Sequence, residues 1–157
     1  MTADWHGTPR IPLQISRDVV IASVQTDLTE DVLARFSAEL LGFIHRHAAA
    51  GVVVDFSGVD IVDATEFAEL RKLLDMAALL GARPMVAGLS PGIISSLIDA
   101  GADIDGIAGA LHVDDALSRL RGEADVLKSE QEPNGPQVST ESLTADGRDK
   151  TDDADDS

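Results

Sequence analysis

The stretch Val52–Glu69, read as VVVDFSGVDIVDATEFAE, decides the fold. It begins with three β-branched residues, Val52–Val54, which favour a buried strand. Ser57 and Gly58 are turn residues, and after Asp63 the apolar residues recur at helical spacing. The stretch therefore predicts a strand, a short loop and a helix start. The unpaired backbone N–H groups and the helix dipole at such a start favour an anion, so the functional site is expected here.

The composition describes an aliphatic chain of 157 residues, with room for one domain and extensions. Four Phe, one Trp and no Tyr leave the core to Val, Ile, Leu and Ala. The absence of Cys excludes disulfides, a thiolate metal site and a Cys nucleophile. No apolar run approaches the ~18–20 residues that span a bilayer, and the first ten residues do not resemble a signal peptide. A cytoplasmic protein is expected.

The formal net charge of -16 argues against nucleic acid as a partner, because phosphate binding requires basic patches. From Ser129 onward the chain holds nine acidic and two basic residues and few apolar ones. Such a segment buries too little apolar surface to offset its ordering entropy. Residues 128–157 are therefore expected to form a disordered acidic tail.

The first quarter of the chain predicts a hairpin and a helix. Residues 1–10 have no periodicity and are interpreted as a loose arm. Ile11–Ser16 alternates and is expected at a sheet edge, because Pro12 has no N–H to donate. Val19–Gln25 is the expected second strand of the hairpin. The following helix is expected to have Thr29 as its N-cap and to close at Ala48–Ala50 and Gly51.

The rest of the domain alternates between strands and helices. A helix from Asp63 to Gly81 is followed by a strand at Arg83–Leu89 and a helix at Pro91–Ala100. That third helix has Ser90 as its expected N-cap, and it is expected to bury four apolar residues, Ile93, Ile94, Leu97 and Ile98. Ile104–Leu111 could be a short edge strand, and Val113–Leu127 predicts a last helix. We therefore expect one α/β domain over residues 11–127, with about four helices and a mainly parallel sheet of four to five strands that opens with an antiparallel hairpin.

This strand order, VVVDFSGVDIVDATEFAEL and the later GARPMVAGLSPGIISSLIDAGAD together resemble a STAS domain. Within that family the chain is similar to the RsbS-type scaffold of the stressosome, over roughly Ile11–Arg121. The resemblance implies a non-catalytic partner-switching regulator without cofactor or metal. It would bind a GHKL-type serine kinase, assemble with RsbR-type STAS proteins and itself, and control a sigma-factor stress pathway. The implied partner-binding residues are Ser57, Asp60, Asp63, Ala64, Thr65, Glu66 and Glu69.

The usual phosphate acceptor of the family is missing here. Members of the family carry Ser or Thr directly after the loop Asp, and this chain has Ala64 after Asp63. Thr65 follows one position later, about 100° further around the helix, so it need not face the same way. Ser96, with Ser95 beside it, matches a position that is phosphorylated in some RsbR-type members. Thr65 and Ser96 are the candidate acceptors, and the alternative interpretation of Thr65 is that it forms a helix cap with Asp63.

Other interpretations remain open. The chain could be a free anti-sigma factor antagonist with a single anti-sigma kinase, or a sensor of a nucleotide or other small ligand. His45 and His47 are two residues apart and point to different helix faces, which argues against a metal site. Asp55, Asp60 and Asp63 crowd one loop, as in a receiver domain. That class, however, also needs an acidic pair after its first strand and a Lys on a late strand, and we find neither.

Overall fold

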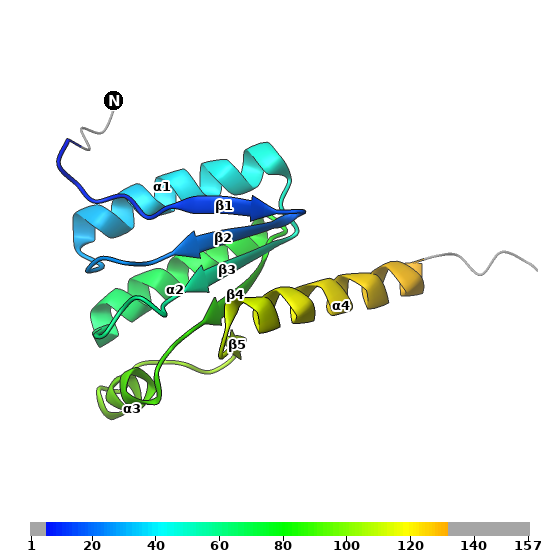
Figure 1. The fold of residues 1–157 in the computed structure, drawn as a ribbon. Coiled ribbons are helices and arrows are strands. Elements are labelled where there is room, and N and C mark those ends of the chain that lie inside the picture. The colour runs from blue at the N-terminus through cyan, green and yellow to red at the C-terminus, as the bar shows by residue number, and fades with distance from the viewer. Residues whose placement is uncertain (1–5, 132–157) are drawn as a thin grey trace, which may run out of the picture.

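The computed structural model describes residues 6–131, which form a five-stranded sheet with helices on both faces (Figure 1). The strands lie in sequence order across the sheet, β1-β2-β3-β4-β5. β1 pairs antiparallel with β2, and every later pair is parallel. The predicted fold is therefore confirmed. The elements are β1 Leu13–Ser16, β2 Val19–Ser23, α1 Glu30–His47, β3 Gly51–Asp55, α2 Ala64–Leu79, β4 Arg83–Ala87, α3 Pro91–Asp99, β5 Gly109–Ala110 and α4 Val113–Gln131.

The central strand β3 is buried on both faces. Val52 and Val54 pack into the core beneath α1, α2 and α3, whereas Val53 and Met85 of β4 pack against Leu120 of α4. Because side chains alternate along a strand, a run of three valines supplies apolar groups to both layers. Figure 1 shows α4 on one side of the sheet and α1 and α2 on the other.

The edges of the sheet are short. β5 pairs with only two residues of β4, Val86 and Ala87. Pro84 lies at the next position of β4 whose backbone faces β5, and it has no N–H to continue the ladder. The expected edge strand within Ile104–Leu111 is thus present but only two residues long. At the opposite edge lies β1, as its Pro12 predicted.

Thr29 caps α1 as predicted, its side-chain oxygen accepting the Val32 N–H at 3.3 Å. The predicted end of this helix is confirmed at Ala48 but not at Gly51. Ala48 terminates α1 in a left-handed conformation, with φ of 47°, and Ala49 donates to the Ile44 carbonyl at 3.1 Å. Gly51 instead begins β3, where an added Cβ would lie 3.2 Å from Cδ1 of Leu120. Gly51 therefore lies in close contact with α4 and does not form the end of α1.

Two predictions about the later helices also need correction. Ile93 and Leu97 of α3 are buried, but Ile94 and Ile98 are exposed, Ile98 by 54%. Ile93 and Leu97 are one turn apart on the face of this nine-residue helix that packs on the core, and Ile94 and Ile98 each follow one position further around the helix. α4 continues through Gln131, four residues beyond the expected boundary at Leu127. The rest of the predicted disordered tail, residues 132–157, lies outside the described residues, as do residues 1–5.

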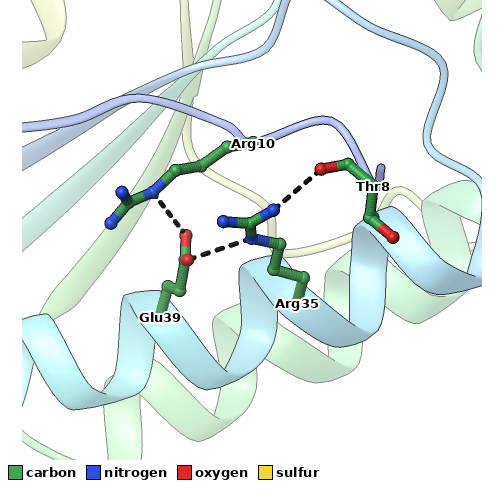
Figure 2. A network of polar contacts seen from close by, with 4 residues as sticks. All are labelled: Thr8, Arg10, Arg35 and Glu39. Carbon is green, nitrogen blue, oxygen red and sulfur yellow. Dashed lines mark hydrogen bonds and ion pairs between the residues drawn. The ribbon is translucent and has the colours of Figure 1, made fainter. Parts of the chain in front are cut away.

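The predicted loose arm is attached to α1 where the structure describes it (Figure 2). Arg35 donates to the Thr8 carbonyl at 2.7 Å, and Glu39 accepts hydrogen bonds from both Arg10 and Arg35 at 3.1 Å. Ile11, directly after the arm, is buried in the main core. Residues 8–10 therefore lie along α1. The bond from Arg35 holds the Thr8 end of this segment, and the ion pair of Arg10 with Glu39 and the burial of Ile11 hold the other end.

Leu40 of α1 and Leu79 of α2 test the packing of the core, because one is buried and the other is exposed. Leu40 is 0% exposed and Leu79 is 87% exposed. Leu40→Ala is expected to lower the free energy of unfolding by about 2–5 kcal/mol, because it leaves a cavity under the sheet. Leu79→Ala should change it by no more than about 0.5 kcal/mol. Chemical denaturation of both variants measures this, and equal losses would contradict the packing described.

Candidate functional site

The candidate site is the loop between β3 and α2, at the carboxyl edge of the parallel strands. Asp55 ends β3, and its carboxylate accepts both the N–H and the hydroxyl of Ser57, each at 3.0 Å. A second backbone turn follows, in which Val59 donates to the Phe56 carbonyl at 3.0 Å. Phe56 itself is fully buried. The start of the loop is therefore held by Asp55 and Phe56, and neither side chain is free for chemistry.

Gly88, in the turn after β4, packs directly against this loop. Its φ is +74°, and a Cβ there would lie 2.7 Å from the Ser57 nitrogen and 2.8 Å from Oδ1 of Asp55. Both distances are shorter than any real Cβ contact, so only glycine fits this position without displacing the loop. This contact with Ser57 was not predicted from the sequence. The contact joins the β3–α2 loop to the turn that precedes α3.

Asp63 and Glu66 form a capping box at the start of α2. Oδ1 of Asp63 accepts the Glu66 N–H at 2.8 Å, and the Asp63 N–H donates to Oε2 of Glu66 at 3.0 Å. This arrangement satisfies two backbone N–H groups that a helix start leaves unpaired. Both residues were predicted as partner-binding residues. Their carboxylates already have a structural role, although both remain partly accessible at the surface.

Thr65 and Ala64 face different surroundings. Thr65 is exposed and lines a groove between α1 and α2 of about 730 Å³, whereas Ala64 is half-buried and does not line it. The hydroxyl of Thr65 therefore does not occupy the place that a hydroxyl at position 64 would have. Thr65 also stands outside the capping box, whose two members are Asp63 and Glu66. Its hydroxyl makes no hydrogen bond within residues 6–131.

The α1–α2 groove gathers four of the seven predicted partner-binding residues: Asp63, Thr65, Glu66 and Glu69. Across the groove, α1 and the residues before it contribute further polar and apolar groups, among them Leu28, Glu30, Leu33 and Ser37. Lys72 is the basic residue of the lining and is bonded to Glu69 at 2.6 Å. The groove thus has apolar walls and an acidic rim. Ser57 and Asp60 are exposed on the loop outside it.

The contribution of α1 to this groove was missed in the sequence. Leu33 of α1 is half-buried and lines the groove. Met76, in the fourth turn of α2, is 40% exposed there. The sequence indicates this groove only through apolar residues that flank the buried stripe of α1. That stripe consists of Val32, Phe36, Leu40 and Ile44.

The second candidate acceptor lies on another helix. Ser96 and its neighbour Ser95 are both exposed on α3. Neither belongs to the α1–α2 groove. The connection to the first site is indirect, through the contact between Gly88 and Ser57 just before α3. The two candidate acceptors are thus on separate parts of the surface.

The histidines and aspartates that suggested other chemistry do not converge. His47 stacks on Phe43 with ring centroids 4.3 Å apart, and both His45 and His47 are exposed. No three His, Asp or Glu side chains within residues 6–131 are grouped so that they could hold a metal ion. None of the helices described is both long and apolar enough to cross a bilayer.

No protein-family model and no curated protein matches this chain. Solved structures do. A serine-to-glutamate variant of RsbS from Moorella thermoacetica is 28% identical, with a TM-score of 0.65 over 73% of this chain and 97% of that chain. A structure of the stressosome, described as a signal integration and transduction hub, matches at 28% identity and a TM-score of 0.64, over 72% of this chain and 98% of that chain.

The anti-sigma factor antagonist SpoIIAA in its unphosphorylated form has a TM-score of 0.57 at 16% identity, over 71% of this chain and 96% of that chain, which shows the common fold alone. The chain therefore has the fold of a STAS domain, as the sequence predicted. Among these STAS structures it is similar to RsbS of the stressosome.

Gly88 and Gly101 provide a matched test of the site. Both have a φ of +74°, but nothing lies within 4 Å of a Cβ built on Gly101. Gly101→Ala should therefore cost only the left-handed backbone, about 1–2 kcal/mol of unfolding free energy. Gly88→Ala adds the clash with Ser57 and Asp55 and is expected to cost about 1–3 kcal/mol more. Denaturant unfolding measures the difference, and equal costs would mean that the loop does not depend on Gly88.

Proposed function

We propose that this chain is a non-catalytic, RsbS-like partner-switching regulator that acts as a scaffold and antagonist in a stressosome-type assembly. The observation that carries the proposal is the similarity to RsbS over nearly the whole length of that protein. In this proposal the chain is cytoplasmic, assembles with RsbR-type STAS proteins and with itself, and holds a GHKL-type serine kinase. Release of the kinase then controls a sigma-factor stress pathway.

The α1–α2 groove and the adjacent loop are the proposed kinase-binding surface. The groove offers apolar walls from Leu33 and Met76, and its rim carries Glu30, Asp63, Glu66 and Glu69. A partner with a basic, partly apolar face would be complementary to it. Such complementarity acts mainly on the association rate and on the choice of partner. Ser57, Asp60 and Ala64 would extend the same surface along the loop and the start of α2.

Thr65 is the proposed regulatory acceptor. Its side chain is accessible and stands among the carboxylates of Asp63, Glu66 and Glu69 at the groove. A phosphate would add about -1.5 to -2 of charge to a rim that is already acidic. The bulk of the phosphate at the groove and the cost of desolvating its charge against the apolar part of the partner's face would both favour release.

Thr65→Glu is expected to weaken binding of the kinase about tenfold, a change of about 1.4 kcal/mol in binding free energy. The matched control is Ser96→Glu, which adds the same charge at an exposed position on α3. These substitutions avoid Asp63, whose replacement would also remove the helix cap. A binding titration with the serine kinase measures both affinities, with circular dichroism as a check of the fold. A loss at Ser96→Glu alone would move the switch to α3.

The acceptor itself is identified by phosphorylation. With kinase and ATP, the unchanged chain is expected to gain one phosphate, and Thr65→Val should abolish this gain because it keeps the branched shape but removes the hydroxyl. Ser96→Ala should have no effect. Ala64→Ser restores the usual acceptor of the family and should be phosphorylated in combination with Thr65→Val. Retention of the phosphate in Thr65→Val would contradict the role of Thr65.

Two alternative functions can be distinguished from the proposed scaffold by the size of the native complex and by the thermal midpoint. A free anti-sigma factor antagonist would be recovered from the host cell in a small complex with one kinase. A stressosome scaffold sediments in a very large particle with other STAS proteins. A nucleotide-sensing module would show a reproducible shift of its thermal midpoint with a panel of nucleotides, which is not expected of a scaffold.

A further inference from the structure

A pocket of about 270 Å³ opens at the amino ends of the parallel strands, on the edge of the sheet opposite the β3–α2 loop. The β1–β2 turn, the first residues of β2, β3 and β4, and the middle of α4 enclose it. Ten Lys and Arg residues lie within residues 6–131, and four of them line this pocket. Its charged lining residues are Arg17, Asp18, Arg83, Arg121, Asp125 and Lys128.

Three of the four cations have no carboxylate partner. Arg83 is paired with Glu123 at 2.6 Å. Arg17, Arg121 and Lys128 form no ion pair with any residue in the described part of the chain. Arg121 and Lys128 are seven residues apart, so they lie on the same face of α4, two turns from each other. The pocket therefore brings together cationic groups whose counter-charge is missing.

Arg121 is the residue at which the missing counter-charge matters most. Its Nε is buried and makes no hydrogen bond within residues 6–131. Its Nη2 donates to the Ser16 hydroxyl at 3.2 Å, which is a neutral acceptor. A buried donor on a charged group destabilises the folded state when no acceptor replaces the lost water. An anion beside this guanidinium would supply both an acceptor and a counter-charge.

Arg17 has an unusual backbone conformation for an arginine. Its φ is 59°, in the left-handed region that glycine and asparagine favour in a two-residue hairpin turn. The side chain is exposed and lines the pocket. Non-glycine residues held in this region are concentrated at sites that bind ligands, where the strain keeps a side chain in place. The turn thus positions a guanidinium across the pocket from α4.

The backbone donors at this end of the sheet are already used. The Ala50 and Gly51 N–H groups both donate to the Asp18 carbonyl, at 2.8 and 3.4 Å, and the Arg83 N–H donates to the Ala50 carbonyl at 3.0 Å. A ligand would therefore be held by side-chain charges. Two guanidinium forks and an ammonium group are the donors that bind phosphate in proteins.

The size and the carboxylates of the pocket limit the ligand. Pockets that enclose drug-sized molecules measure about 300–1,000 Å³, so this one has room for a phosphate group and little more. Asp18 and Asp125 are exposed at its mouth and would repel a second or third phosphate. The net charge of -16 disfavours an anionic membrane surface as the source of the phosphate.

We propose that this pocket binds the phosphate group of a small, soluble phosphate monoester. The guanidinium groups of Arg17 and Arg121 and Nζ of Lys128 hold the phosphate oxygens, and the rest of the ligand lies outside the pocket. The site is at the opposite edge of the sheet from the proposed kinase-binding surface. Its occupancy is therefore independent of that surface, and the two proposals fail separately.

A titration of the full-length chain with inorganic phosphate, followed by the amide resonances in NMR, tests the proposal. At constant ionic strength, the amides of Gly51 and Ala124 are expected to shift and to saturate. Sodium chloride at the same ionic strength should not reproduce these shifts. The absence of a saturable shift, or shifts confined to the start of α2, would overturn the proposal.

Charge-removing variants identify the residues that hold the phosphate. Arg121→Gln is expected to weaken phosphate binding about tenfold. Lys128→Gln, at an exposed position, should weaken it about threefold. The matched control is Arg46→Gln, which removes a cation from α1 outside the pocket and should leave the affinity unchanged. Equal affinities in all three variants would overturn the assignment.

Arg17→Gly separates binding from folding. Glycine adopts the left-handed conformation without strain, so the thermal midpoint of this variant should stay the same or rise. Phosphate binding should weaken by a similar factor as in Arg121→Gln, because one guanidinium is lost. Unchanged phosphate affinity in Arg17→Gly would mean that this arginine is a turn residue alone and would overturn its role in the pocket.

Two further ligands distinguish the sources of the phosphate. Vesicles that contain phosphatidic acid should leave the chain in the supernatant after sedimentation, and ATP should bind more weakly than inorganic phosphate. Cosedimentation that is lost in Arg121→Gln would assign the pocket to a lipid headgroup and would overturn the soluble ligand. Tighter binding of ATP than of phosphate would overturn the assignment to a single phosphate group.

Discussion

The burial of β3 on both faces is the constraint on which the rest of the structure depends. Val52, Val53 and Val54 are each 0% exposed, and the strand bonds to β2 on one side and β4 on the other. Full burial of an aliphatic side chain stabilises the folded state by roughly 1.5–3 kcal/mol. Because successive side chains point to opposite faces, the strand contributes this burial to both layers of the core. Because the chain has so few aromatic residues, aliphatic side chains on both faces of this strand fill the core.

The candidate site takes its geometry from the end of that strand. Asp55 closes β3 and orders Ser57, and Gly88 allows the neighbouring turn to approach both. The capping box then begins α2 without unpaired groups at Asp63. A partner would therefore meet a surface whose backbone is already positioned, which lowers the entropy lost on binding. Asp55, Asp63 and Glu66 at this edge already take part in hydrogen bonds with backbone N–H groups of the loop and of α2.

Three faces of α1 have different surroundings. Its buried stripe, Val32 to Ile44, packs on the sheet. One flank, with Leu33 and Ser37, forms a wall of the acidic α1–α2 groove, and the other flank, with Ala38 and Phe43, lines a second groove, beside β1. The charges differ accordingly, with carboxylates at the first groove and arginines at the second. A single helix thereby separates two surfaces of opposite charge.

The sequence by itself determined the order of the elements, the caps at Thr29 and Ser90, the edge position of β1 and the STAS resemblance. These features depend on neighbours along the chain: a side chain that reaches a backbone N–H three residues away, or a proline that lacks a donor.

The tertiary structure decided that Ala48 ends α1, that Ile94 and Ile98 are exposed, and that Thr65 faces α1 while Ala64 does not. It also decided the contact between Gly88 and Ser57. Each of these depends on which element lies alongside and at what distance. Periodicity identifies the apolar side of a helix, but only packing determines how much of that side is covered.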